Sequence, residues 1–228
     1  MIPSRVLAVG AHPDDLEFYA GATLAGLARE GAEVRIVICT DGSRGGGAGA
    51  ELAAERRSEA ERAAAALGCA RPRFLGYADG ELVNDEALRR DLVREIRTAR
   101  PELLLAHDPT TFWTRSGALA RLGHSDHRAA GEAVLDALYP RAMLGSFYPE
   151  LAGQGLVPWI VRELWLFDTI APDHFQEVTA MSAAKREALL CHASQNPTAL
   201  ARDADLEAEG LRERAGFAAE GFRKLRLY

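Results

Sequence analysis

Two short segments of the sequence combine histidine with aspartate at close spacing. Residues 11–15 read AHPDD, and residues 124–127 read HSDH. Together they offer three imidazoles and three carboxylates, the mixture of nitrogen and oxygen ligands that suits zinc. A catalytic zinc needs three protein ligands and an open position for water. The two segments can supply a His–Asp–His set and still leave an aspartate and a histidine for proton transfer.

Each segment taken alone also has a purely structural interpretation. An aspartate before a helix often caps it, so Asp14 or Asp15 can serve as the N-cap of a helix that begins near Leu16. A histidine near a helix start can be an ordinary polar residue. The combination favours a metal site, because His124 and His127 are three residues apart and lie on one side of a helical turn.

Alternating strand-like and helix-like stretches place the two segments. An apolar run at 6–9 ends just before the first segment, and an apolar run at 103–106 precedes the second. The other expected strands are the runs at 34–39, 74–75, 161–167 and 175–178. Apolar residues at helical spacing or strong helix formers predict helices at 16–29, 51–67, 85–99 and 183–192, and one from Ser125 or Asp126 to Leu138.

This order of elements predicts an α/β fold, with a mostly parallel sheet covered by helices on both faces. Ligands of such sheets bind outside the carboxyl ends of the strands, which is where both segments lie. The chain has 228 residues, of which 48% are hydrophobic, and it shows no internal repeat or long linker. We therefore expect residues 1–228 to form a single domain. The least regular parts are 43–49, 107–123 and 140–158.

The composition excludes several classes of protein. A net charge of −6 lacks the electrostatic footprint of a nucleic-acid binder. No stretch approaches about 18 uncharged apolar residues, so no membrane span is expected, and the N-terminus reads as a strand rather than a signal peptide. Three widely spaced cysteines fit a reducing cytosol and predict a cytoplasmic protein. The basic run Arg223, Lys224 and Arg226 is interpreted as a solvated edge.

Other common catalytic motifs do not occur in the sequence. It contains no G-x-G-x-x-G dinucleotide fingerprint, no P-loop, no G-x-S-x-G nucleophile elbow and no H-E-x-x-H helix. It also has no C-x-x-C pair for a thiolate zinc site. The glycines at 45–49 can in principle cradle an anion, but a mobile loop is the favoured interpretation because no dedicated lysine follows them.

As a pair, the two histidine segments resemble the LmbE-like, or PIG-L-like, family of zinc-dependent N-acetylglucosaminyl deacetylases. Further blocks are similar to the same family, and the similarity covers most of residues 5–196. These blocks are TDGSRGG followed by ERRSEAERAAAALG, then FLGYADGEL, GHSDHRAAGEAVLDALYPRA and KREALLCHASQ. The resemblance implies a Rossmann-like fold and one zinc ion per chain, with His12, Asp15 and His127 as the zinc ligands.

The same resemblance implies catalytic roles. Asp14 would be the general base. His124 would stabilise the oxyanion and protonate the leaving amine, with Asp126 orienting it. A carboxylate beside His124 is expected to raise the pKa of the imidazole. Arg56 matches an arginine that the family uses at the substrate, and Asp41 is interpreted either as a ligand of a sugar hydroxyl or as the cap of a turn.

The expected function is therefore removal of an N-acetyl or other N-acyl group from a small amino sugar or its conjugate. One alternative is a metal-dependent phosphoesterase, although such enzymes tend to use two bridged metals and these loops offer few extra ligands. The other is a non-catalytic zinc or ligand-binding module, which would leave Asp14 and His124 without a role. Many family members have glutamate at the position of Leu16, and this difference leaves the identity of the substrate undetermined. The resemblance also implies a homo-oligomer, either a trimer or a hexamer.

Overall fold

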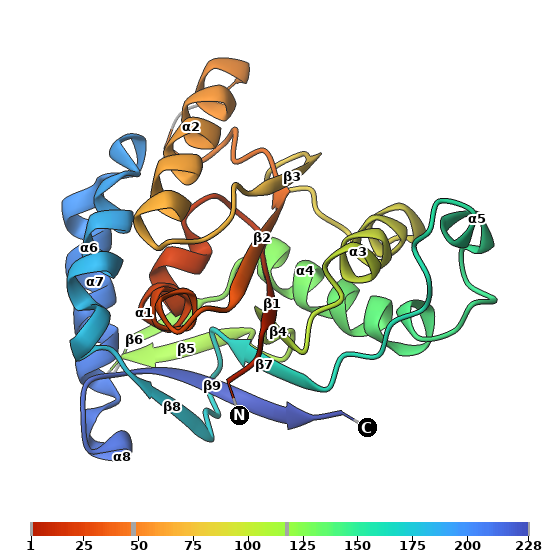
Figure 1. Ribbon diagram of the computed structural model, residues 1–228. Coiled ribbons are helices and arrows are strands. Elements are labelled where there is room, and N and C mark those ends of the chain that lie inside the picture. Colours follow the sequence, from red (N-terminus) through yellow and green to blue (C-terminus); the bar gives the residue numbers. More distant parts are fainter. Residues whose placement is uncertain (1, 47–48, 117–118, 228) are drawn as a thin grey trace.

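This computed structural model describes residues 2–46, 49–116 and 119–227. Among these residues, a seven-stranded sheet forms the centre of the fold (Figure 1). Its strand order is β3-β2-β1-β4-β7-β9-β8. The first five strands run parallel to one another, whereas β9 is antiparallel to both β7 and β8. The strand bounds are β1 Arg5–Gly10, β2 Glu33–Thr40, β3 Arg73–Tyr77, β4 Leu103–His107, β7 Glu163–Phe167, β8 His174–Glu177 and β9 Ala219–Arg226.

Helices cover both faces of this sheet, as predicted. Figure 1 shows α3 and α4 on one side and α1, α2, α6 and α7 on the other. The longer helices are α1 Asp15–Arg29, α2 Ala50–Ala66, α3 Glu86–Ala99, α4 Ser125–Asp136, α6 Ser182–Leu190 and α7 Pro197–Gly210. The shorter ones are α5 Pro149–Ala152, α8 Arg212–Ala215, a π-helical turn at Ala137–Ala142 and 3-10 turns at Thr179–Met181 and Ala193–Gln195.

The core forms two layers because successive residues of a strand point to opposite faces. In β1, Leu7 and Val9 pack on the side of α3 and α4, while Val6 and Ala8 pack on the side of α1 and α2. All four side chains are buried. Parallel strands covered on both faces have continuous apolar sequences, and this explains why the short run at 6–9 predicts the strand correctly.

The C-terminal part of the fold differs from the prediction. The side chains of Arg223 and Arg226 are exposed, as predicted, but their backbone lies in β9, which pairs with β7 on one side and β8 on the other. The fully buried Phe222 anchors this strand in the core. Helix α7 was also not predicted. The partners of β9 are distant in sequence, so no local pattern specifies its pairing.

The start and end of α4 also differ from the prediction. His124 occupies the N-cap position, where its ring accepts a hydrogen bond from the backbone of Asp126, so neither Ser125 nor Asp126 is the cap. The α-helix ends at Asp136, and the chain continues as the π-helical turn that contains Pro140, a residue that lacks the N–H a helix needs. His124 is therefore fixed at a helix terminus.

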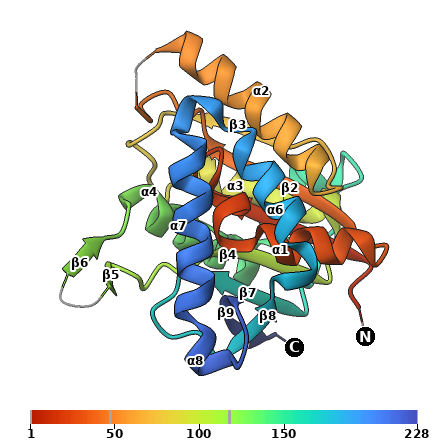
Figure 2. The ribbon, with the colours of Figure 1, turned by 90° about the vertical axis from the view of Figure 1, so that its left-hand side faces the viewer.

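Two of the irregular regions contain structure of their own. Residues 107–123 include the antiparallel pair β5 Trp113–Ser116 and β6 Leu119–Leu122, which extends from the body of the molecule (Figure 2). Residues 140–158 include α5. The interpretation of the glycine run as a mobile loop falls partly on residues 47 and 48, outside the described residues. Among the helices that the structure describes, none is both long and apolar enough to cross a membrane.

Candidate active site

The histidine and aspartate side chains of the two segments meet at the carboxyl edge of the parallel strands. His12 and Asp15 follow β1, and His124 and His127 lie at the first turn of α4. Three further polar residues reach the same place, although they were not among the principal sequence candidates. These are Asp79 after β3, His107 at the end of β4 and Asp168 after β7.

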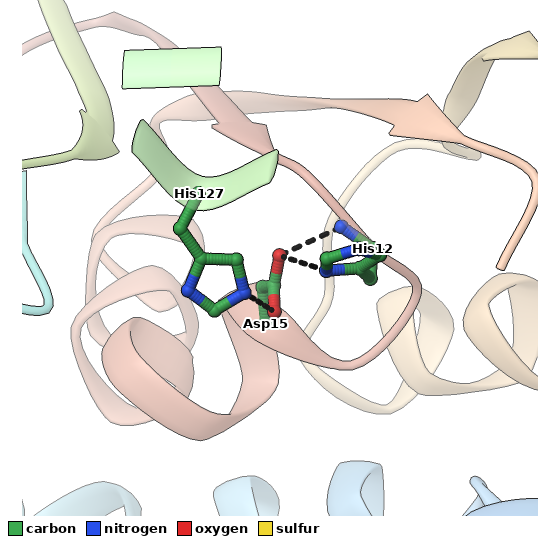
Figure 3. A group of neighbouring side chains, drawn as sticks. All are labelled: His12, Asp15 and His127. Carbon is green, nitrogen blue, oxygen red and sulfur yellow. Dashed lines mark hydrogen bonds and ion pairs between the residues drawn. The ribbon is translucent and has the colours of Figure 1, made fainter. Parts of the chain in front are cut away.

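His12, Asp15 and His127 form a compact group, with one ligand atom of each residue within 4.8 Å of the others. Figure 3 shows the Asp15 carboxylate between the two imidazoles. The Nε2 atom of His127 is 3.2 Å from Asp15 Oδ1, and Nδ1 of His12 is 3.6 Å from Asp15 Oδ2. Two imidazole nitrogens and one carboxylate oxygen match the donor set of a catalytic zinc. The predicted ligand residues therefore fit a metal ion.

Two carboxylates hold the far side of the His12 ring. Asp79 Oδ1 and Asp126 Oδ2 lie 3.2 and 3.3 Å from His12 Nε2. In the neutral ring that a metal requires, their position assigns the hydrogen to Nε2 and leaves the lone pair of Nδ1 for the ion. Burial alone would lower the pKa of His12, but Asp15, Asp126 and Asp79 outweigh it and raise this pKa to about 12. A cluster that holds a proton so firmly also favours a metal cation.

Asp15 is held by donors on one of its two oxygens. Asp15 Oδ2 accepts a hydrogen bond of 2.7 Å from the backbone N–H of His12 and lies 3.0 Å from His107 Nε2. Burial would raise the pKa of Asp15, but His127, His107 and His12 hold it well below the usual range. Asp15 is therefore ionised, as a metal ligand must be.

Asp14 belongs to a different environment. It sits at the N-cap position of α1 with a left-handed φ of 110°, yet its side chain makes no capping hydrogen bond, so helix capping does not explain it. Its carboxylate instead lies 3.2 Å from Arg56 Nη2. Burial raises the pKa of Asp14 to about 6, although the Arg56 guanidinium opposes this shift. A carboxylate with such a pKa can accept a proton near neutral pH.

His124 faces the open side of the cluster, with 45% of its side chain exposed. Its Nδ1 accepts a hydrogen bond of 3.1 Å from the backbone N–H of Asp126, so the neutral ring carries its hydrogen on Nε2. The Asp126 carboxylate is 3.9 Å from this ring, and accepts instead from Gly80 N at 2.7 Å. Asp126 thus orients His124 through its backbone, whereas its side chain supports His12.

The expected rise in the pKa of His124 is wrong in direction. Burial, followed by the neighbouring His12, lowers this pKa, and the Asp126 carboxylate only partly offsets them. The ring centroids of His12 and His124 are 4.6 Å apart in an edge-on arrangement. The structure thus presents His124 as a neutral imidazole with an Nε2–H donor.

Comparisons with known proteins identify the family of this chain. The profile of the family described as PIG-L: GlcNAc-PI de-N-acetylase matches residues 7–138. This chain belongs to the PIG-L family. Diacetylchitobiose deacetylase of Thermococcus kodakarensis is 32% identical over 197 residues, which cover 85% of this chain and 70% of that protein. The sequence-based resemblance is therefore confirmed.

Other relatives extend the comparison. A 1D-myo-inositol 2-acetamido-2-deoxy-alpha-D-glucopyranoside deacetylase of Rhodococcus erythropolis is 34% identical over 175 residues, which span 60% of this chain and only 56% of that protein. The structure of N,N'-diacetylchitobiose deacetylase from Pyrococcus horikoshii superposes with a TM-score of 0.88 at 30% identity, covering 98% of this chain and 84% of that one. The PIG-L fold also occurs in GalB, the 4-carboxy-2-hydroxymuconate hydratase of Pseudomonas putida, with a TM-score of 0.77 at 22% identity.

Arg56 lies beneath the site of this PIG-L chain. Only 3% of the residue is exposed. Its guanidinium donates to the carbonyl oxygens of Pro13 at 2.6 Å and Gly42 at 2.9 Å, as well as pairing with Asp14. A Cβ atom at Gly45 would collide with the same guanidinium, so glycine lets the loop pass over it. These contacts tie the loops after β1 and β2 together, and a direct contact of Arg56 with substrate stays a prediction.

Asp41 has the contacts of a turn cap. Its Oδ1 accepts hydrogen bonds from the backbone N–H groups of Ser43 at 3.0 Å and Asp79 at 3.3 Å. Of the two interpretations of Asp41, the turn cap is therefore confirmed, and binding of a sugar hydroxyl stays a prediction. Through Asp79, this turn also supports the outer side of His12.

Asp79 and Asp168 are the site residues that sequence reasoning missed. Asp79 lies in the block FLGYADGEL, which carries family resemblance but no histidine. Asp168 directly follows the strand predicted at 161–167. The rule that ligands gather at the carboxyl ends of parallel strands applies to both positions. Asp168 directly follows a predicted strand, so its position in the sequence already marks it under this rule.

Proposed function

We propose that this chain is a zinc-dependent N-deacetylase that hydrolyses the acetamido group of an amino sugar or its conjugate. The main support for the proposal is the contrast between two neighbouring features. His12, Asp15 and His127 form a group that could bind a metal, whereas the carboxylate of Asp14 pairs with Arg56 and is not part of this group. The substrates in the names of the relatives are acetylated amino sugars. These names support an amino-sugar conjugate as the substrate. The homo-oligomeric state stays a prediction.

The reaction converts an amide and water into a carboxylic acid and an amine. A zinc ion at the three ligands would supply a water with a pKa lowered to about 7 and would polarise the amide carbonyl. Asp14, with a pKa of about 6, accepts the proton that the attacking water releases. His124, as a neutral ring, presents its Nε2–H to the reacting group and stabilises the developing negative charge. Asp14, once it holds the proton from the water, passes it to the leaving nitrogen. An amine leaves readily only once it is protonated.

Contacts outside the ligand group determine which atoms of His12 and Asp15 can bind a metal. His12 and Asp15 are each held by donors or acceptors outside the ligand group, so their free atoms face the proposed metal. The two other groups of residues that could hold a cation reuse His12 or His127. A phosphoesterase centre with two independent metals would therefore lack a complete second ligand set among the described residues.

A product analysis with the zinc-loaded protein tests the proposal. N,N'-diacetylchitobiose, a GlcNAc-inositol and free N-acetylglucosamine serve as substrates, and p-nitrophenyl phosphate serves as the probe for phosphoesterase activity. We expect free amine and acetate in equal amounts from at least one acetylated sugar, and no phosphate release. Release of phosphate without any free amine would overturn the assignment, and zinc binding without either product would favour the non-catalytic alternative.

A further inference from the structure

The two nitrogens of the His127 ring have different carboxylates as neighbours. Nε2 lies 3.2 Å from Asp15 Oδ1, inside the proposed metal site, and Nδ1 lies 3.0 Å from Asp168 Oδ2, on the outer side. Both His127 and Asp168 are largely buried. A neutral imidazole carries one hydrogen, and an ionised carboxylate can only accept it. The contact with Asp168 therefore assigns the hydrogen to Nδ1 and leaves the lone pair of Nε2 facing Asp15.

The backbone at Asp168 supports this geometry. The residue directly follows β7 and has a left-handed φ of 53°, a conformation that aspartate tolerates better than most residues. The turn is held on both sides: the N–H of Asp108 donates to the Phe167 carbonyl at 2.8 Å, and the Thr169 hydroxyl donates to Asp108 Oδ2 at 2.6 Å. The chain thus fixes the point from which the Asp168 carboxylate reaches His127.

A second imidazole competes for the same carboxylates. The ring of His107 stacks on that of His127 with centroids 4.0 Å apart. His107 Nε2 is 3.0 Å from Asp15 Oδ2, but His107 Nδ1 is 3.8 Å from Asp168 Oδ2, beyond hydrogen-bond distance. Asp168 therefore bonds to only one of the two stacked rings. This bond marks His127 as the ring whose outer nitrogen is protonated and whose inner nitrogen can bind metal.

We propose that Asp168 is a positioning residue that selects the Nδ1–H tautomer of His127 and thereby sets the affinity of the site for a divalent metal. The proposal rests on the proposed zinc-dependent function only for the identity of the metal. Carboxylate partners of this kind typically change metal affinity by about 10- to 100-fold. Asp168 touches neither the proposed metal nor the substrate, and it acts through the orientation and protonation of His127.

Three variants separate the effect of the hydrogen bond from that of the charge. Asp168→Gly removes the acceptor but suits the left-handed backbone, so it preserves the turn. Asp168→Asn removes the charge but keeps an oxygen that can accept from Nδ1. Asp108→Asn is the matched control, because Asp108 is a buried carboxylate at the same edge that bonds to Thr110 and Thr169 and not to a histidine. An asparagine amide can keep both contacts, since the Thr169 hydroxyl can accept from its N–H group, so the turn is retained.

The measurement is the zinc dissociation constant of each metal-free protein, obtained by competition with a chromophoric chelator. We expect Asp168→Gly to weaken zinc binding by about 10- to 100-fold, Asp168→Asn to lie between this variant and the wild type, and Asp108→Asn to bind within twofold of the wild type. In parallel, long-range ¹H–¹⁵N spectra of the metal-free protein report the His127 tautomer. The spectra are recorded above pH 9, because Asp15 and Asp168 outweigh burial and raise the pKa of His127 to about 9. They should show Nδ1–H in the wild type and a mixture in Asp168→Gly.

Each contrary outcome has a definite meaning. Zinc binding by Asp168→Gly within twofold of the wild type, with the tautomer unchanged, would overturn the proposal. Equal losses in Asp168→Asn and Asp168→Gly would assign the effect to charge alone and overturn the tautomer claim. A wild-type protein that binds zinc but hydrolyses no acetylated sugar would contradict the proposed function without affecting these binding results.

Discussion

Asp14 and Asp15 are adjacent in the chain, but their carboxylates have different partners. Asp15 faces His127 and His107, whereas Asp14 faces Arg56. The left-handed backbone at Asp14, with φ of 110°, turns the chain between the two residues. Adjacent and chemically identical side chains can therefore serve one as a metal ligand and the other as a proton acceptor.

This difference predicts different defects for two isosteric substitutions. Asp14→Asn should keep zinc near one per chain and lower kcat by about 10²- to 10⁴-fold, because it removes only the proton acceptor. Asp15→Asn should lose metal affinity, with activity partly restored by excess zinc. Zinc content and kcat measured side by side check both expectations. Near wild-type turnover by Asp14→Asn would remove Asp14 from the mechanism.

The two histidines of α4 allow a second paired comparison. His124→Ala should lower kcat by about 10²- to 10³-fold, because it removes a donor to the developing oxyanion. Zinc content should stay near the wild-type value, because His124 is outside the His12–Asp15–His127 group. His127→Ala should lose the metal itself. Elemental analysis and steady-state kinetics of both variants decide between the roles, and the opposite pattern would show that they are interchanged.

At the residue scale, the sequence predicts the part of the site that lies in local motifs. His12 and Asp15 come from one turn, and His127 comes from another, so family resemblance and the sheet rule bring them together. Asp79 and Asp168 come from separate strand ends without a recognisable motif, and their contacts exist only in the folded chain. The same reason explains Asp126, whose carboxylate contacts His12 rather than its sequence neighbour His124.

At the scale of elements, a buried ion pair forms hydrogen bonds with the backbone of α1. The backbone N–H of Ala22 donates to Glu220 at 2.8 Å, and the carbonyl oxygen of Phe18 accepts from Lys185 Nζ at 2.6 Å. Lys185 and Glu220 also pair with each other at 2.7 Å. The turn of α1 that carries Asp15 is thereby tied to α6 and β9.

Gly21 leaves the space through which Lys185 reaches α1. A Cβ atom at Gly21 would lie 3.1 Å from Lys185 Cγ, whereas one at Gly26 would lie 3.8 Å from Met181 Cγ, an ordinary contact distance. The Lys185 side chain is held at its end by two hydrogen bonds and cannot move aside easily. Gly21 is therefore needed for packing, while Gly26 is not.

Two alanine substitutions in the same helix test this difference. Gly21→Ala should lower the free energy of unfolding by about 1–3 kcal/mol, because it overpacks the core against Lys185. Gly26→Ala should raise it by about 0.4–1 kcal/mol, since alanine is the better helix former and restricts the unfolded chain. Chemical denaturation of both variants measures the two values. Stabilisation by Gly21→Ala would show that Lys185 can shift without cost.

The elements also differ in how far the sequence predicts them. The strands at 6–9, 34–39 and 103–106 were predicted because their apolar runs are buried on both faces. The sequence does not predict strand β9, because its apolar residues Phe222 and Leu225 are interspersed with charged residues. One of the charged side chains, Glu220, is buried and pairs with Lys185. A buried charge is acceptable only where its partner is supplied, and that partner lies 35 residues away in the sequence.

At the scale of the whole molecule, the parallel sheet brings the ends of β1, β3, β4 and β7 to one edge, where His12, Asp79, His107 and Asp168 meet. This architecture could be predicted from the order of the elements. It does not determine the reaction by itself, because a hydratase at 22% identity has the same fold. The proposed reaction follows from the side chains at this edge and requires a metal bound among them.

A zinc titration of the metal-free protein, with free amine release from an acetylated amino sugar recorded at each step, tests this dependence most directly. We expect no turnover without metal, then a rate that rises with bound zinc and stops rising at one ion per chain. Amine and acetate should appear in equal amounts throughout. Full activity of the metal-free protein, or a protein loaded with one zinc per chain that releases no amine from any acetylated amino sugar, would contradict this expectation.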